Sequence, residues 1–255
     1  MPESLKFPGF GPEQFSFFRQ LARNNRKEWF DRNRERYQSH IVGPFRALLR
    51  ELEPWALELN PDFETLGKTN RNFSRINRDI RFARDKSPYR AQYYLYLFVP
   101  TPQENHSSTR LYVGLAAEAV TVGFAMYDGG RESPMNTIFR PKVLEPGRLR
   151  RALTASRGGA ELLALIRKAG AGRRYESYWY SLEKREWPKH QGFPAGPGDW
   201  KRMKGWVVRK RFAPSSRELA AGRFPAAVKK IFRELYPLYA FCAAPARAKA
   251  WSAGL

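Results

Sequence analysis

Residues able to recognise an anion are concentrated in the stretch from Arg75 to Tyr89. It contains five cationic and two acidic residues, and its only large apolar residues are Ile76, Ile80, Phe82 and Tyr89. An ordinary solvated helix carries more acidic side chains four residues from its cations, and a packed core cannot hold so many arginines without partners. We therefore expect this stretch to meet either an anion or carboxylates from elsewhere in the fold.

Arginine suits a phosphate or carboxylate ligand because its planar guanidinium donates two parallel hydrogen bonds and stays charged at any cellular pH. The binding residues expected within the stretch are Arg75, Arg78, Asp79, Arg81, Lys86 and Tyr89. Asp79 would orient Arg75 or Arg78, since a carboxylate among several cations is held in its ionised form. The alternative is a structural ion-pair network between the helical third and the sheet, because charge clusters also form for structural reasons.

Three residues near the start of the chain, Asn24, Asn25 and Trp29, are expected to line the same pocket. Their spacing also fits a purely structural role. Asn25 followed by Glu28 has the N-cap and N3 spacing of a capping box, and Trp29 fits the buried stripe of a helix. Both interpretations remain open from the sequence.

A second basic region is interleaved with tyrosine and tryptophan in the last third of the chain. We expect Lys184 and Arg185 to take part in ligand binding. Further cations extend this surface: Lys201, Arg202, Lys204, Arg209, Lys210 and Arg211. A groove for single-stranded nucleic acid combines cations for phosphates with ring faces for bases. The sequence does not contain the pattern of an established nucleic-acid-binding module. An α+β core also explains the aromatic residues.

Catalytic patterns are sparse. The three histidines are scattered without metal-ligand spacing, and the sequence lacks a nucleophile elbow, a P-loop and a dinucleotide fingerprint. Asp79 and Asp85 beside Lys86 suggest Mg²⁺-assisted phosphoester cleavage, but two carboxylates among five cations make a poor divalent site. No metal or cofactor is expected, and whether the protein is an enzyme stays open.

Composition favours a polyanionic partner. The 255 residues include 46 Lys or Arg against 24 Asp or Glu, a formal net charge of +22. Such an excess attracts nucleic acid or phosphorylated metabolites, although an arginine-rich composition alone also produces it. The single cysteine, Cys242, rules out an internal disulfide and fits a small core residue. No run approaches the roughly 18 apolar residues of a membrane span, and the first residues lack a signal peptide's apolar core, so we expect a cytoplasmic protein.

Hydrophobic periodicity predicts one α+β domain over residues 1–255. Its expected parts are a helical region at 12–60, the basic motif at 68–90, a sheet with helices at 91–212, and a C-terminal helical region at 214–243. Dense aromatic and β-branched runs at 93–99, 110–117 and 119–127 predict strands, and their short connections predict an antiparallel meander. A helix is expected at 146–170 and a strand at 175–187. We therefore expect a central, mainly antiparallel sheet with helices packed from both ends of the chain.

The sequence resembles a family of bacterial and fungal conserved hypothetical proteins, domain-of-unknown-function family 2461. The resemblance rests on the signature R-x-x-R-D-x-R-F-x-x-D-K-x-P-Y at 75–89, an amino-terminal pattern at 15–30, and a weaker motif at 182–193. It covers nearly the whole chain but implies no established activity.

Three hypotheses follow for function. The first is an anion-binding protein with a phosphate-bearing ligand or nucleic acid seated on Arg75–Tyr89. The second is an enzyme acting on a phosphorylated or carboxylated substrate in a pocket built by the same motif. The third is a structural or interaction domain in which the motif is an ion-pair network. The sequence does not indicate the ligand's identity or the oligomeric state.

Overall fold

The computed structural model describes most of the chain. The described residues are 6–81, 83–100, 109–129, 131, 133–143, 175–183, 186–192, 194 and 197–243. The helix expected at 146–170 and the expected binding residues Lys184 and Arg185 lie outside these ranges.

The centre of the fold is an antiparallel sheet of six strands in the order β1-β2-β3-β6-β4-β5 among the described residues. The strands are β1 (Gln92–Leu97), β2 (Thr109–Ala116), β3 (Ala119–Tyr127), β4 (Glu176–Ser181), β5 (Lys189–Gln191) and β6 (Met203–Phe212). The predicted meander is confirmed, because β1 pairs with β2 and β2 with β3 in antiparallel register. β4 is shorter than the predicted strand at 175–187.

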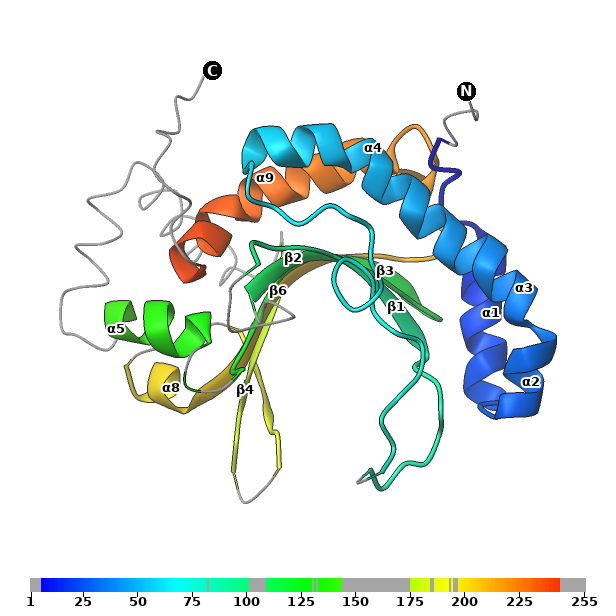
Figure 1. The fold of residues 1–255 in the computed structure, drawn as a ribbon. Coiled ribbons are helices and arrows are strands. Elements are labelled where there is room, and N and C mark those ends of the chain that lie inside the picture. The colour runs from blue at the N-terminus through cyan, green and yellow to red at the C-terminus, as the bar shows by residue number, and fades with distance from the viewer. Residues whose placement is uncertain are drawn as a thin grey trace.

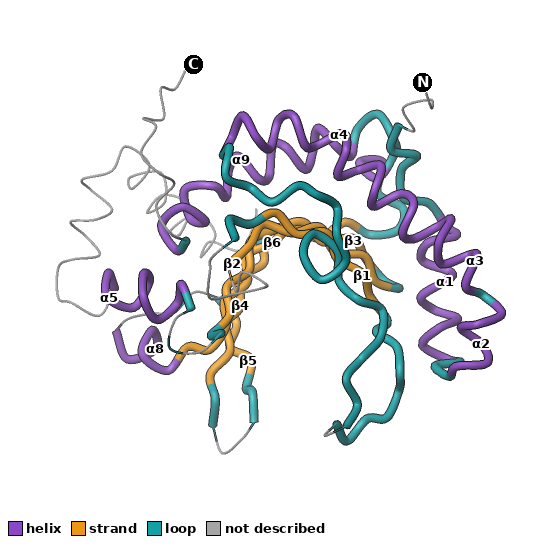
Figure 2. Tube along the Cα trace, viewed as in Figure 1, coloured by secondary structure: helices purple, strands orange, loops and turns teal. Residues whose placement is uncertain are grey.

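Helices from both ends of the chain cover one face of this sheet (Figures 1 and 2). The α-helices are α1 (Pro12–Arg23), α2 (Lys27–Arg32), α3 (Arg34–Tyr37), α4 (Gly43–Leu59), α5 (Arg140–Val143), α8 (Pro197–Arg202) and α9 (Phe224–Cys242). Two π-helical segments, η1 (Gln38–Val42) and η2 (Met135–Phe139), and a 3-10 turn, η3 (Arg217–Leu219), complete the described helical elements. The α+β class expected from periodicity is therefore correct.

The core lies between this helical layer and the sheet. Phe15, Phe18 and Leu21 of α1 are fully buried, and so is Phe232 of α9. α9 packs on β2 and β3 and also contacts α4. Cys242 is buried at the end of α9, as its apolar neighbours predicted. Burial of these apolar stripes is the main force that holds the helices on the sheet.

The capping-box interpretation of Asn25 is wrong. α2 begins at Lys27 with Arg26 as its N-cap, and no side chain caps it. The side chain of Asn25 instead bonds to the backbone of Tyr89, which lies 64 residues away. The side-chain amide of Asn25, which its spacing to Glu28 predicted would cap α2, is thus bonded to a distant part of the chain.

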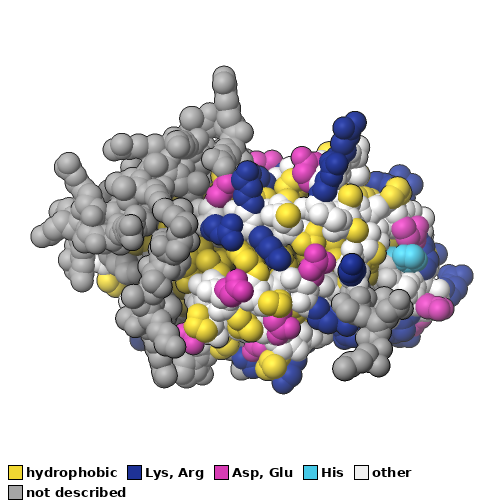
Figure 3. Space-filling model, turned by 90° about the horizontal axis from the view of Figure 1, so that it is seen from above, with side chains coloured by type: hydrophobic (Ala, Val, Ile, Leu, Met, Phe, Trp, Pro, Cys, Tyr) yellow, Lys and Arg dark blue, Asp and Glu magenta, His cyan; other side chains and the backbone are white. Residues whose placement is uncertain are grey.

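The sheet arches, and its concave face lies away from α4 and α9 (Figure 1). The β4–β5 hairpin and the segment that precedes β1 extend downward as the two sides of the arch. On the helix-covered face that Figure 3 presents, basic side chains are interspersed with acidic and apolar ones and form no single patch. Among the described residues, no helix is both long and apolar enough to cross a membrane.

Candidate functional site

The predicted binding motif forms a closed loop beside β1. An isolated antiparallel bridge joins Asn77 to Tyr89 at its base. The backbone N–H of Arg78 donates to the carbonyl of Pro88 at 2.8 Å, and that of Arg90 donates to the carbonyl of Ile76 at 2.7 Å. The basic motif is therefore neither a helix nor a strand of the sheet, but a loop with a paired base.

Charged side chains of the motif largely pair with one another. Arg78 Nη1 bonds to the carboxylate of Asp85 and donates to the carbonyl of Ser87 at 3.1 Å. Arg81 contacts Asp79 through Nε at 3.0 Å and Nη2 at 2.7 Å, so the prediction that Asp79 pairs with Arg75 or Arg78 is wrong. The side chains of this second pair are 77% and 60% exposed, so they lie in solvent and contribute little to stability.

Other cations of the motif have different roles. Lys86 Nζ donates to the carbonyl of Ile80 at 3.1 Å and so helps to close the loop. Arg75, Arg84 and Arg90 are exposed. The motif therefore contains both an internal network that shapes the loop and cations that remain on its surface.

The Asp85 carboxyl is expected to titrate with a pKa of about 2. Hydrogen bonds from Ser87, followed by the bond from Arg78, favour its ionised form. Because this pKa lies below the ordinary value of about 3.9, the stabilising effect is present above about pH 4 and disappears as the pH falls toward 2. NMR titration of the side-chain carboxyl carbons measures this pKa.

The matched variant for this titration is Ser87→Ala, which should move the pKa of Asp85 toward its ordinary value. Asp79 provides the internal control, because its pKa is held low by Arg81 and not by Ser87. An Asp85 pKa that stays near 2 in Ser87→Ala would show that the serine hydroxyl does not support the carboxylate.

Asn25 fastens the loop to the turn between α1 and α2. Its Nδ2 donates to the carbonyl of Tyr89 at 2.8 Å, and its Oδ1 accepts from the N–H of Tyr89 at 3.0 Å. The Tyr89 ring stacks on Phe30 with 4.2 Å between centroids and is buried. Two predicted site residues thus meet, but as an anchor for the loop.

The other two residues expected near the amino-terminal helices have local roles. Asn24 follows α1 and donates through Nδ2 to the carbonyl of Gln20 at 3.0 Å. Trp29 is half-buried, and its ring lies 5.7 Å from that of Phe17. Both residues stabilise the helical layer beside the loop.

Tyrosines gather on the concave face of the sheet. Those on this face are Tyr94, Tyr96, Tyr112, Tyr127, Tyr178 and Tyr180, which form or pack against a second apolar cluster separate from the main core. We call this surface the tyrosine face. It arises because alternate residues of a strand point to the same side, and the strand register aligns them across the sheet. One such row runs Tyr127–Gly205–Tyr180–Lys189.

Cations lie over these rings. The guanidinium of Arg110 is 4.1 Å from the ring centroid of Tyr96, and that of Arg209 is 5.1 Å from the centroid of Tyr178. Lys189 Nζ lies 3.9 Å from the same Tyr178 ring. The rings hold these cations in place. Arg209 Nε is also paired with the carboxylate of Glu176 at 2.9 Å, so Arg209 offers an anion only its remaining N–H groups.

The hydroxyls of Tyr94 and Tyr112 stay neutral at cellular pH. Burial raises the pKa of Tyr94 and of Tyr112 well above the ordinary value of 10. A neutral ring floor beneath cations does not repel a negatively charged ligand. The period-two tyrosine pairs at 94/96 and 178/180 indicate such an aromatic floor, but only the strand register brings the two pairs together.

A cavity of about 230 Å³ indents one end of the tyrosine face. Residues that line it include Tyr94, Gly114, Thr121, Arg209 and Arg211. Two arginines and a hydroxyl around an aromatic wall can bind a phosphate by charge-assisted hydrogen bonds. Ala91 and Gln92 also line it and directly follow the basic loop, so the predicted motif and the tyrosine face meet here.

In the described part of the chain, possible metal ligands are not grouped into the Mg²⁺ site that Asp79 and Asp85 suggested. No group of three or more His, Cys, Asp or Glu residues is arranged there to hold an ion. Asp79 and Asp85, the candidate magnesium ligands, are each engaged by an arginine.

Comparison with known proteins identifies a family and no activity. A family model described as a conserved hypothetical protein (DUF2461) matches residues 13–241. A search of curated proteins found no match.

Proposed function

This chain belongs to the DUF2461 family of conserved hypothetical proteins. We propose that it binds single-stranded nucleic acid. Phosphates would contact the cations of the tyrosine face and of the Arg75–Tyr89 loop, and bases would stack on the tyrosines. The observation on which this proposal rests is the alignment of six tyrosines with Arg110, Arg209 and Lys189 on one sheet face.

Chemistry favours a single strand over a duplex. Stacking on a protein ring requires an unpaired base, and each base–aromatic contact contributes about 1–3 kcal/mol. Partly exposed rings such as Tyr96 and Tyr180 suit this contact, and cations over the rings suit the adjoining phosphates. A duplex hides its base faces, so it would gain only the electrostatic part of the interaction.

In this proposal the basic loop has two roles. Arg78 shapes the loop through its ion pair with Asp85 and its hydrogen bond to the carbonyl of Ser87. Arg75, Arg84 and Arg90 are exposed and would contact phosphates. A strand leaving the 230 Å³ cavity past Gln92 would reach these loop cations.

A small phosphorylated ligand is the second candidate, favoured by the cavity itself. Its lining by Arg209, Arg211 and Thr121 suits one phosphate group. Such a ligand would occupy this cavity alone and leave the rest of the tyrosine face unused.

Fluorescence-anisotropy titration with labelled oligo(dT), oligo(U) and a DNA duplex tests the proposal. The variant is Arg110→Gln/Arg209→Gln. We expect it to bind single strands roughly tenfold or more weakly at physiological salt, and to lower the dependence of log affinity on log salt by about 1–2. The duplex should bind more weakly than either single strand.

The matched control is Arg34→Gln/Arg233→Gln. It removes the same charge, and both of its arginines also lie over rings, at 5.5 Å from Phe30 and 5.8 Å from Trp55, but on helical elements. An equal loss in the two double variants would reduce binding to bulk charge and overturn the proposal. Binding of inorganic phosphate that is lost in Arg110→Gln/Arg209→Gln, without binding of any oligonucleotide, would favour the second candidate.

A further inference from the structure

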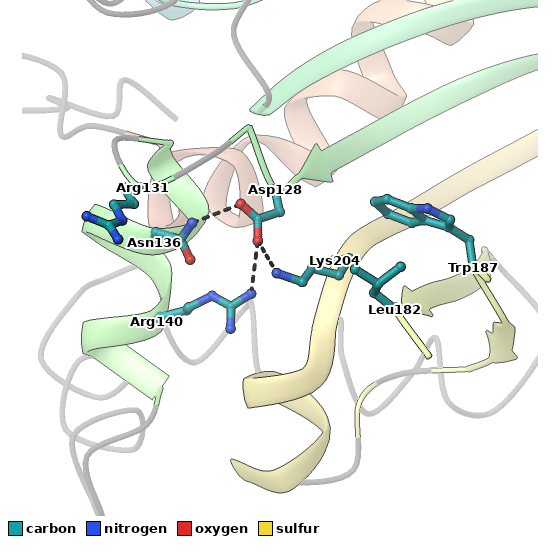
Figure 4. A pocket seen from close by; sticks show the side chains of 7 residues that line it. All are labelled: Asp128, Arg131, Asn136, Arg140, Leu182, Trp187 and Lys204. Carbon is teal, nitrogen blue, oxygen red and sulfur yellow. Dashed lines mark hydrogen bonds and ion pairs between the residues drawn. The ribbon is translucent and has the colours of Figure 1, made fainter. Parts of the chain in front are cut away.

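A second and larger cavity, of about 550 Å³, lies at the end of β3 and the start of β6 (Figure 4). Its lining residues are Asp128, Arg131, Asn136, Arg140, Leu182, Trp187 and Lys204. None of these residues belongs to the tyrosine face or to the basic loop. They come from the ends of β3 and β6, from η2 and α5, and from the connection between β4 and β5.

Asp128 is the centre of the polar side of this cavity. Its carboxylate accepts from Asn136 Nδ2 at 2.8 Å and lies 2.7 Å from Lys204 Nζ and 3.5 Å from Arg140 Nη2. The Asp128 side chain is only 10% exposed, so these contacts hold it in a fixed position. Two cations, Lys204 and Arg140, contact this carboxylate, and Arg131 adds a third positive charge to the lining, so an excess of positive charge remains.

Arg140 has a positioning role. Its Nη1 donates to the carbonyl of Lys201 at 2.6 Å, and its Nη2 donates to the carbonyl of Met203 at 2.7 Å. These bonds tie α5 to the end of α8 and the start of β6. Lys204, whose side chain is one-third exposed, and the exposed Arg131 are therefore the cations best placed to contact a ligand.

The opposite wall is apolar. Figure 4 shows Leu182 and Trp187 on one side of Lys204, with Arg131 and Arg140 on the other. Leu182 is 47% exposed and Trp187 is 53% exposed. Only two other large apolar residues in the described part of the chain are exposed. Two exposed apolar side chains beside a cluster of cations indicate a surface that receives a ring.

We propose that this cavity binds a small planar aromatic anion of mononucleotide size. The ring would stack on Trp187 and contact Leu182, and the phosphate would bind Lys204 and Arg131. The combination of an apolar wall with a few placed cations, and the volume of the cavity, are those of small-molecule sites. Asp128 would keep Lys204 oriented and could accept a hydrogen bond from an exocyclic amine or a sugar hydroxyl.

Isothermal titration calorimetry with AMP tests this site, with adenosine and inorganic phosphate as single-feature probes. AMP is expected to bind at least tenfold more tightly than either probe, because only AMP has both the ring and the phosphate. Trp187→Ala is expected to weaken AMP binding roughly tenfold without changing the melting temperature, since the side chain is half exposed. Arg131→Gln should weaken AMP and phosphate alike.

Two controls separate this site from the others. Leu66→Ala removes a side chain that is 68% exposed elsewhere and should leave AMP binding unchanged. Arg110→Gln/Arg209→Gln, which tests the tyrosine face, should also retain AMP binding. Failure of AMP to bind, or an unchanged affinity in Trp187→Ala, would overturn the proposal, and neither result would bear on oligonucleotide binding by the tyrosine face.

Discussion

Replacing Asn72 with alanine is expected to lower the free energy of unfolding by about 3 kcal/mol. The side chain of Asn72 is fully buried and makes three hydrogen bonds. Its Oδ1 accepts from the N–H of Gly67 at 2.8 Å, and its Nδ2 donates to the carbonyls of Glu64 at 2.6 Å and of Tyr96 at 3.1 Å. Alanine would leave one donor and two acceptors without partners in the interior, each at a cost of about 1 kcal/mol or more.

Urea unfolding of three variants makes this prediction specific. Asn72→Asp preserves the shape but turns a carboxylate oxygen toward two carbonyls, so we expect it to be at least as destabilising as alanine. Asn77→Ala is the control, because Asn77 is exposed and its bridge to Tyr89 uses the backbone alone. A midpoint for Asn72→Ala within experimental error of the parent would contradict the structure at this point.

Asn72 matters for the site because it begins the segment that protects the edge of the sheet. The N–H of Tyr96 donates to the carbonyl of Asn72 at 2.7 Å, and the N–H of Ser74 donates to the carbonyl of Tyr94 at 3.1 Å. This segment covers the outer edge of β1 and leads directly into the basic loop. Loss of Asn72 should therefore loosen the loop together with the row of tyrosines on β1.

Local patterns were sufficient to predict most of the elements. Most of the aromatic run predicted at 93–99 lies in β1, which ends at Leu97, and alternating residues of it such as Tyr93 and Leu95 are buried in the core. The connection between β2 and β3 is too short for a parallel crossover, so their antiparallel pairing is predictable from the sequence. Phe15, Phe18 and Leu21 recur at helical spacing, so α1 also follows from the sequence alone.

The hydrogen-bond and ion-pair partners of several site residues could not be predicted from local sequence spacing. Asn25 has a capping spacing with Glu28, yet its two bonds go to Tyr89. Arg78 lies next to Asp79 in the chain but pairs with Asp85, because the turn of the loop brings residues seven apart together. These choices depend on the path of the whole chain and not on local spacing.

The tyrosine face could be predicted only in fragments. Pairs at 94/96 and 178/180 each indicate an aromatic strand face, but their common side depends on the register of β2, β3 and β6 between them. A shift of one residue in any strand would turn its members to the opposite side. The close approach of β3 and β6 within this register depends on Gly123.

Gly123→Ala is expected to destabilise the protein by about 3 kcal/mol, the upper part of the range for overpacking. A Cβ at Gly123 would lie 2.3 Å from the carbonyl oxygen of Val208 and 2.8 Å from Cα of Arg209. Both atoms belong to the backbone of β6, so relief requires β3 and β6 to separate. On the concave face of a curved sheet side chains crowd together, and glycine allows the strands to approach.

Alanine substitutions at Gly114 and Gly222 are the comparison for Gly123→Ala, and thermal and urea unfolding of all three variants measures their stabilities. A Cβ at Gly114 would approach the Tyr94 ring to 2.4 Å, but that atom belongs to a partly exposed side chain and not to a strand backbone, so Gly114→Ala should cost less, about 1 kcal/mol. Gly222→Ala meets no atom within 4 Å and should be nearly neutral. The order of destabilisation is the test. If Gly123→Ala were as mild as Gly222→Ala, the two strands would not approach as closely as the structure requires, and Arg209 would not be held over the tyrosine face by β3.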